Sequence, residues 1–306
     1  MSPLSHGETC LAVPKRSMPA HSKAACHHTQ LIMNSQPSTF SWPLARKLAD
    51  YASDAYVRAT CLDARTQASA NVSLDPIMGA IVVAFRGSKS PRDFIQDAKF
   101  RQVELLWSND NYTAKVHEGF LEDFEAITVA VISQVKTFLS GAAAPPCQPK
   151  IFITGHSLGG ALAILCALEF CRQKIPVTAV YTFGQPRVGN IIFAKIYDQT
   201  AVTASPPLVP SAPGSHDVVT LRDLTFRVVN QNDIVPRLPW ALREYWHCGQ
   251  EIFLPVGGGW WVNPSCALKC LSDLIGLYGA YRHREDVLIA EHYLKSYETQ
   301  IANIKP

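Results

Sequence analysis

Long apolar runs, clusters of basic residues and a high content of charge are all missing from this sequence of 306 residues. Because no apolar stretch reaches the roughly 20 residues of a membrane-spanning helix, no transmembrane segment is expected. Charged residues make up 17% of the chain, the formal net charge is only +3, and lysines and arginines form no run. A nucleic-acid partner is therefore not expected, because binding to a phosphate backbone requires concentrated positive charge.

The first 39 residues lack the apolar core of a signal peptide, so we find no sequence signal for secretion in them. They are rich in Pro, Ser and His and include three basic residues. We expect residues 1–39 to be disordered or loosely attached. Residues 40–306 are expected to form one domain, since 47% of the chain is apolar and this length can bury one large core.

The nine cysteines are an odd number, so a monomer has at least one free thiol. Cys166 and Cys171 lie in an apolar helical stretch and are expected to be buried thiols. Cys266 and Cys270 have a spacing that suits a metal, but no second pair of His or Cys residues lies at a matching distance along the chain. No metal site is expected.

Short apolar segments alternate with helical patterns from residue 79 onward. The patterns predict strands at 79–85, 151–154, 177–183, 225–230 and 251–256, and helices at 43–60, 119–139, 161–167, 190–200, 267–279 and 286–304. Such alternation predicts an α/β fold in which helices flank a mostly parallel central sheet. The proline-rich segment 201–215 is expected to be a surface insertion.

Residues 151–161, with the sequence IFITGHSLGGA, are the most informative stretch of the chain. An apolar β-branched run ends at Gly155, Ser157 follows in a Gly-x-Ser-x-Gly frame, and an apolar helix-forming run begins at Ala161. This is the strand, sharp turn and helix of a nucleophile elbow. Ser157 is expected to have a strained backbone, and side chains at Gly155 and Gly159 would collide with the neighbouring helix and strand. The pattern predicts a serine hydrolase with Ser157 as its nucleophile.

A serine hydroxyl needs a base and an acid to act as a nucleophile, and on this architecture they follow in the order Ser, Asp, His at strand ends. Asp233 comes soon after the predicted strand 225–230 and is the preferred acid. The candidate bases are His247, His283 and His292. Residue order alone does not separate His283 from His292.

Two further expectations concern the surroundings of the nucleophile. An oxyanion hole needs two donors, which we assign to the backbone N–H of Leu158 and to Ser88 in the loop after the strand 79–85. Each good donor would stabilise the transition state by roughly 3 kcal/mol. His156 precedes the nucleophile, but the elbow directs it away from Ser157, so it is expected to be a packing residue.

Six segments of the sequence together resemble the class 3 lipase family, the type represented by filamentous-fungal triacylglycerol lipases. They are VAFRGS at 83–88, KVHEGF at 115–120, ITGHSLGGA at 153–161, YTFGQPRVGN at 181–190, NDIVPRLP at 232–239 and HCGQEI at 247–252. The segments occur in family order over roughly residues 40–300. The resemblance implies an α/β-hydrolase fold with a short lid after the oxyanion loop.

The resemblance also implies roles for particular residues. The nucleophile of the family falls on Ser157, its acid on Asp233 and its oxyanion serine on Ser88. Its histidine, on the last helix and usually followed by a tyrosine, falls on His292, whereas His247 matches a position that is not catalytic.

The family lid falls on residues 90–97. In this segment Phe94 stands where many lipases have tryptophan. We expect Phe94 and Ile95 to cover the site in water and to turn outward at a lipid surface.

The function that the resemblance implies is hydrolysis of acylglycerol esters through an acyl-enzyme, without a metal or organic cofactor. A feruloyl-type esterase and a mono- or diacylglycerol lipase would use the same side chains. A catalytically silent homologue that binds lipid or a protein is the alternative from another class; against it, every triad and oxyanion position holds a competent residue. Because members of the fungal branch are usually exported, the resemblance also suggests secretion.

Overall fold

The computed structural model describes residues 40–88, 101–105, 113–141, 150–202, 218–239, 244–255, 258–265, 267–268, 290 and 292–304. The segment 1–39, the lid segment 90–97 and most of the insertion 201–215 lie outside these residues, as does most of the predicted helix 267–279. Among the described helices, none combines the length and the apolar character needed to span a membrane.

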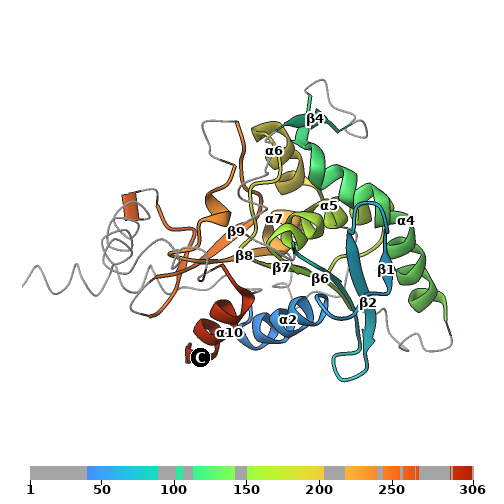
Figure 1. The fold of residues 1–306 in the computed structure, drawn as a ribbon, viewed down its shortest axis with the longest axis horizontal. Helices are drawn as coiled ribbons and strands as arrows, with labels where there is room; N and C mark the ends of the chain where they lie inside the picture. The colour runs from blue at the N-terminus through green and yellow to red at the C-terminus, as the bar shows by residue number, and fades with distance from the viewer. Residues whose placement is uncertain are drawn as a thin grey trace, which may run out of the picture.

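An eight-stranded sheet forms the centre of the molecule, in the order β1-β2-β3-β6-β7-β8-β9-β10 (Figure 1). Its strands are β1 Cys61–Leu62, β2 Ser69–Asp75, β3 Ala80–Phe85, β6 Lys150–His156, β7 Ala179–Phe183, β8 Thr225–Asn230, β9 Gln250–Leu254 and β10 Trp261–Val262. Neighbouring strands from β3 to β9 are parallel, and β1, β2 and β10 are antiparallel at the two edges. The prediction of a mostly parallel α/β sheet is confirmed.

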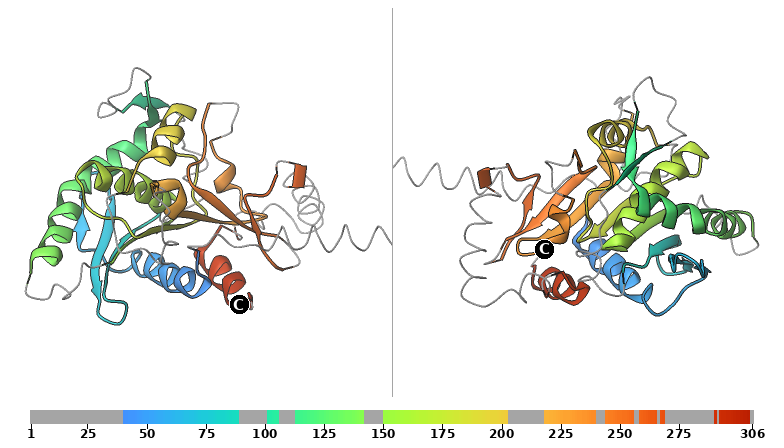
Figure 2. Two further views of the ribbon diagram at one scale, coloured as in Figure 1. Left: turned by 180° about the vertical axis from the view of Figure 1, so that it is seen from behind. Right: turned by 45° about the horizontal axis from the view of Figure 1, so that its top comes forward.

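Helices cover both faces of this sheet, as Figures 1 and 2 show. On one face lie α4 Glu118–Ser140 and α5 Leu158–Arg172, and on the other α2 Trp42–Asp54 and α10 Leu294–Asn303. Side chains of β3 alternate between the two layers, since Ile81 and Val83 pack with α4 and α5 while Val82 packs with α2 and α10. Burial on both faces explains the continuous apolar run of this strand.

Shorter elements complete the described part. A two-stranded antiparallel sheet pairs β4 Gln102–Glu104 with β5 Lys115–His117. The remaining helices are α6 Ile191–Gln199, α7 Leu221–Leu224 and the 3-10 turn η1 Val235–Arg237.

Two predicted helices end or begin elsewhere than expected. The first stops at Asp54 instead of residue 60, and Tyr56 lies in the turn that follows. At the other end of the chain, helix α10 begins at Leu294, since Tyr293 has an extended backbone (φ −63°, ψ 139°) and caps it, while residues 286–289 and 291 of the predicted helix lie outside the described residues. His292 therefore lies in a turn before α10 and not on a helix, which corrects the expectation for its local structure.

Helix α10 is held in place by Arg46 of α2. The Arg46 guanidinium donates to the carbonyl oxygens of Ile301, at 2.9 Å, and Ile304, at 2.7 Å. A cation at these last carbonyls also complements the negative end of the helix dipole. The contact fixes α10, and with it the turn that holds His292, against α2.

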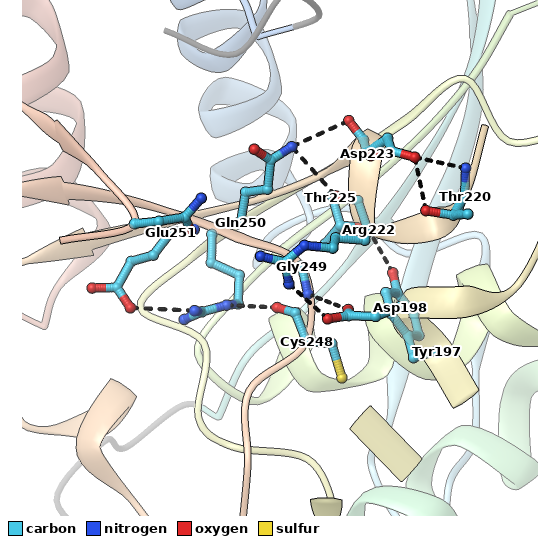
Figure 3. Close-up of polar contacts among 12 residues, drawn as sticks. Tyr197, Asp198, Thr220, Arg222, Asp223, Thr225, Cys248, Gly249, Gln250 and Glu251 are labelled. Atoms are coloured by element: carbon cyan, nitrogen blue, oxygen red, sulfur yellow. Dashed lines mark hydrogen bonds and ion pairs between the residues drawn. The ribbon is translucent and has the colours of Figure 1, made fainter. Parts of the chain in front are cut away.

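The amino ends of β8 and β9 are joined by a separate polar cluster, shown in Figure 3. Asp198 of α6 accepts from the backbone N–H of Gly249 at 2.7 Å and from Arg222 at 2.8 Å. The buried Arg227 donates to the carbonyl of Cys248 at 2.8 Å and pairs with Glu251 at 3.2 Å. Because Ser157 follows the carboxyl end of β6, this cluster lies at the opposite end of the parallel strands and supports the sheet.

Candidate active site

Ser157 occupies the turn between β6 and α5 with φ 58° and ψ −129°. This positive φ is the strained backbone that the elbow motif predicts. A Cβ atom on Gly155 would overlap the backbone of Gly159 at the start of α5, and one on Gly159 would overlap the carbonyl of Phe85 in β3. The expected steric role of both glycines is confirmed, and the close approach of strand and helix holds the serine in its conformation.

Three of the predicted site residues meet at this turn. Ser157 Oγ lies 2.8 Å from His292 Nε2, and His292 Nδ1 lies 2.8 Å from Asp233 Oδ2. Ser157 is 1% exposed, and His292 and Asp233 are fully buried. The hydroxyl, the imidazole and the carboxylate thus form one hydrogen-bonded chain, although 135 and 59 residues separate the two pairs of partners in sequence.

The carboxylate of Asp233 is fixed through both oxygens. Asp233 follows β8 in a turn, and its Oδ1 accepts from the backbone N–H of Val235 at 2.8 Å. Its Oδ2 accepts from His292 and from the Tyr297 hydroxyl, the latter at 2.5 Å. With both oxygens engaged, the carboxylate has little freedom to rotate, and His292 Nδ1 faces an acceptor.

Tyr297 is a site residue that our sequence reasoning missed. It lies on α10, is fully buried, and its hydroxyl also accepts from the backbone N–H of Asn230 at 3.2 Å. Burial raises the pKa of Tyr297 well above its ordinary value of 10, and the charge of Asp233 adds to this effect, so the hydroxyl stays a neutral donor. A tyrosine five residues after a histidine is no motif in itself, and only the packing of α10 reveals the contact.

Gly184, directly after β7, provides the space for the imidazole and the carboxylate. Its φ is +59°, and a Cβ atom there would lie 2.8 Å from Asp233 Oδ2 and 3.0 Å from His292 Nδ1. Gly184 belongs to YTFGQPRVGN, one of the six segments that resemble the lipase family, but the sequence does not show that this glycine borders the site.

His156 packs below the site, as expected, and also makes two hydrogen bonds that the sequence did not suggest. Its ring stacks on that of His292, with centroids 4.7 Å apart. Its Nε2 lies 2.6 Å from the carbonyl oxygen of His292, and its Nδ1 lies 2.8 Å from the Tyr56 hydroxyl.

Both candidate oxyanion donors lie in segments that border Ser157. Leu158 is the first residue of α5, where backbone N–H groups point out of the helix and the helix dipole favours negative charge. A Cβ atom on Gly87 would lie 3.2 Å from the Cβ of Ser157, so the loop after β3 passes beside Ser157, and Ser88 is the next residue. The oxyanion role of Leu158 and Ser88 stays a prediction.

Among the remaining candidates, His247 bonds through its Nε2 to the carbonyl of Pro236 at 2.7 Å. It is not part of the hydrogen-bonded series formed by Ser157, His292 and Asp233. His283, Phe94 and Ile95 lie outside the described residues. Within the described ranges, no group of three His, Cys, Asp or Glu side chains is arranged to hold a metal ion.

The described cysteines are free thiols. Cys166 is buried in α5, as expected, whereas Cys171 is only partly buried. Burial nevertheless raises the pKa of Cys171 to about 12. Such thiols are poor nucleophiles, since thiolate is the reactive form.

Comparison with known proteins gives a consistent result. The family model "Lipase (class 3)" matches residues 82–242. A lipase of Rhizomucor miehei is 32% identical over 202 residues, which are 63% of this chain and 46% of the relative. A secreted mono- and diacylglycerol lipase of Fusarium solani is 31% identical over 205 residues, or 66% of this chain and 52% of the relative. This chain therefore spans about half the length of these curated relatives.

Solved structures agree with the sequence comparison. One is a triacylglycerol lipase whose catalytic centre is formed by a serine protease triad; it has a TM-score of 0.51 and 30% identity, with 65% of each chain covered. Lipase II from Rhizopus niveus has a TM-score of 0.59 over 75% of this chain and 85% of that chain, and at 24% identity the likeness shows the shared fold.

Proposed function

Because the chain belongs to the class 3 lipase family, we propose that it hydrolyses carboxylic esters of acylglycerols, with Ser157 as nucleophile, His292 as general base and Asp233 as the acid that orients the base. The observation that supports this most strongly is the buried chain from Ser157 through His292 to Asp233, each link 2.8 Å long. Three side chains distant in sequence have no packing reason to form such a chain, whereas acyl transfer to a serine requires it.

The hydrogen-bond partners support one arrangement of the protons. Asp233 Oδ2 accepts hydrogen bonds, so His292 Nδ1 bears the hydrogen and its Nε2 presents a lone pair to the Ser157 hydroxyl. When Ser157 attacks an ester carbonyl, its proton passes to His292 Nε2, and the carboxylate of Asp233 stabilises the imidazolium that forms. The Tyr297 hydroxyl donates to the same carboxylate oxygen and restrains its position.

The rest of the cycle uses the same groups. Negative charge that develops on the ester oxygen would be bound by the backbone N–H of Leu158, at the N-terminus of α5, together with Ser88. His292 then gives its proton to the leaving alcohol, and the acyl group stays on Ser157. Water attacks this acyl-enzyme by the same proton path and releases the fatty acid.

Acylglycerols are the proposed substrates because the relatives named above are lipases, one of them acting on mono- and diacylglycerols. The test is an assay of triolein, diolein, monoolein, methyl ferulate and p-nitrophenyl esters with the wild type and with Ser157→Ala, Asp233→Asn and His292→Ala. We expect hydrolysis of acylglycerols by the wild type, and a loss in kcat of at least about 10⁴-fold for each variant, larger for Ser157→Ala and His292→Ala than for Asp233→Asn.

Other results of this assay would contradict the proposal. Methyl ferulate hydrolysed in preference to every acylglycerol would favour the feruloyl-type esterase. Folded wild-type protein with no activity on any ester would favour the silent homologue. Activity retained by His292→Ala would move the base to another histidine.

We also propose that the protein acts outside the cell, because relatives from Fusarium solani and Penicillium cyclopium are secreted lipases. Immunodetection in the culture medium of the source organism, with an intracellular enzyme as lysis control, tests this. Protein found only inside the cells would contradict it.

A further inference from the structure

A second hydrogen-bonded chain lies directly beneath the first and ends on the main chain of His292. It runs from Tyr56, in the turn after α2, to His156, the last residue of β6, and from there to the carbonyl oxygen of His292. His156 is 2% exposed. The family resemblance and the proposed mechanism leave these two side chains without a role.

The direction of each hydrogen bond in this chain can be deduced. The carbonyl of His292 can only accept, so His156 Nε2, at 2.6 Å, bears the hydrogen. The neutral ring then has a lone pair at Nδ1, and the Tyr56 hydroxyl, at 2.8 Å, donates to it. The Tyr56 oxygen also lies against Gly87, in the loop before Ser88, since a Cβ atom on Gly87 would overlap it.

Both side chains are neutral in the folded protein. Burial, and then the neighbouring His292, lower the pKa of His156 well below its ordinary value of 6.5. Burial raises the pKa of Tyr56, which therefore remains protonated. The direction of the hydrogen bonds does not reverse at neutral pH.

His292 has a particular need for such support. It lies in a turn before α10, outside the helix that begins at Leu294. Its imidazole must hold its position while Nε2 takes a proton from Ser157 and later gives it to the leaving alcohol. A displacement of about 1 Å at such a group can lower a rate 10²-fold.

We propose that Tyr56 and His156 are positioning residues for the reaction, which together hold the main chain of His292 and the loop before Ser88 in a fixed relation. The stacked His156 ring supports the face of the His292 ring, its Nε2 hydrogen holds the His292 carbonyl, and the Tyr56 hydroxyl, bonded to His156, packs against Gly87. The inference rests on the proposed hydrolase function, because it concerns the rate of that reaction.

Three variants and one control test the inference, with kcat and KM measured on a p-nitrophenyl ester and Tm measured for each protein. His156→Phe keeps a flat ring but removes donor and acceptor, and we expect kcat to fall at least about tenfold with KM changed less than about twofold. His156→Gln keeps one N–H donor and one oxygen acceptor, and it should recover most of the lost kcat. Tyr56→Phe should lower kcat about three- to tenfold.

The matched control is Tyr51→Phe. Tyr51 lies on α2, and its hydroxyl donates to Asp75 at 2.9 Å, so this variant also loses one tyrosine hydrogen bond. We expect its kcat to equal that of the wild type. A positioning role predicts loss of kcat in Tyr56→Phe but not in Tyr51→Phe even where the two have equal Tm.

The outcomes separate this inference from the proposed function. If the folded wild type hydrolyses no ester, the proposed function fails. If the wild type is active but His156→Phe keeps its kcat, or His156→Gln is as slow as His156→Phe, the positioning role is wrong. Should His156→Phe not fold, Tyr56→Phe decides: a kcat equal to that of Tyr51→Phe would overturn the inference.

Discussion

Replacement of Gly184 by alanine tests whether the geometry of the imidazole and carboxylate governs activity. Gly184 has φ +59°, and the added Cβ would lie 2.8 Å from Asp233 Oδ2 and 3.0 Å from both Cε1 and Nδ1 of His292. Comfortable contacts between such atoms are about 3.5 Å, so the two side chains must move by roughly 0.5 Å or more. A shift of this order at a reacting group is expected to lower kcat/KM by about 10- to 100-fold.

Gly79 offers a matched control for the backbone part of this effect. It has φ +58°, and a Cβ atom there would meet nothing within 4 Å. In both positions alanine costs about 1 kcal/mol for the left-handed backbone, which lowers Tm by a few degrees. Only Gly184→Ala also displaces Asp233 and His292.

The assay measures kcat/KM on a p-nitrophenyl ester and Tm for the wild type, Gly184→Ala and Gly79→Ala. We expect both variants to lose a few degrees in Tm, and only Gly184→Ala to lose activity. If Gly184→Ala keeps wild-type kcat/KM, or if Gly79→Ala loses as much activity as Gly184→Ala, the steric reasoning is refuted.

Three further predictions concern Tyr297, Asp123 and the buried thiols. Tyr297→Phe removes the 2.5 Å hydrogen bond to Asp233. We expect the free energy of unfolding, measured in urea, to fall by about 1.5–3 kcal/mol and kcat/KM to fall about tenfold. If both values stay unchanged, the role of this hydrogen bond is refuted. Burial raises the pKa of Asp123 to about 6, so the folded protein binds the extra proton between about pH 4 and 6 and its stability falls as pH rises through this range. The difference in Tm between Asp123→Asn and the wild type should therefore shift in favour of the variant from pH 4 to 6. A Tm difference that does not depend on pH would contradict this. Burial raises the pKa of Cys166 and Cys248, so peptide mapping should find them alkylated by iodoacetamide at pH 8 only after unfolding; alkylation in the native protein would be the contrary result.

The parallel centre of the sheet is predictable because buried parallel strands have continuous apolar runs. The runs at 79–85 and 225–230 correspond to β3 and β8 almost residue for residue. The antiparallel strand β2, which lies between β1 and β3, was not predicted, although its sequence SANVSLD alternates polar and apolar residues as a half-buried strand does. Its alternating residues include only two large apolar side chains, Val72 and Leu74, so the local signal is weak and the pairing with the neighbouring strands decides the structure.

In the candidate site, too, residues with a local sequence signal could be predicted and residues without one could not. Ser157 is predictable because its elbow is local, and Asp233 because it follows a strand directly. His292 needed the family resemblance, since residue order left His283 equally suitable. Tyr297 and Tyr56 were missed because each acts through a partner far away in sequence, 64 and 100 residues respectively, and such contacts leave no local pattern.

The most direct test of the central claim is to find which side chain reacts with a fluorophosphonate, a reagent that phosphonylates activated serines. The folded protein should take up one equivalent, peptide mass spectrometry should place the adduct on Ser157, and Ser157→Ala should take up none. An adduct on a different residue, or no reaction of the folded wild type, would contradict the proposed chemistry.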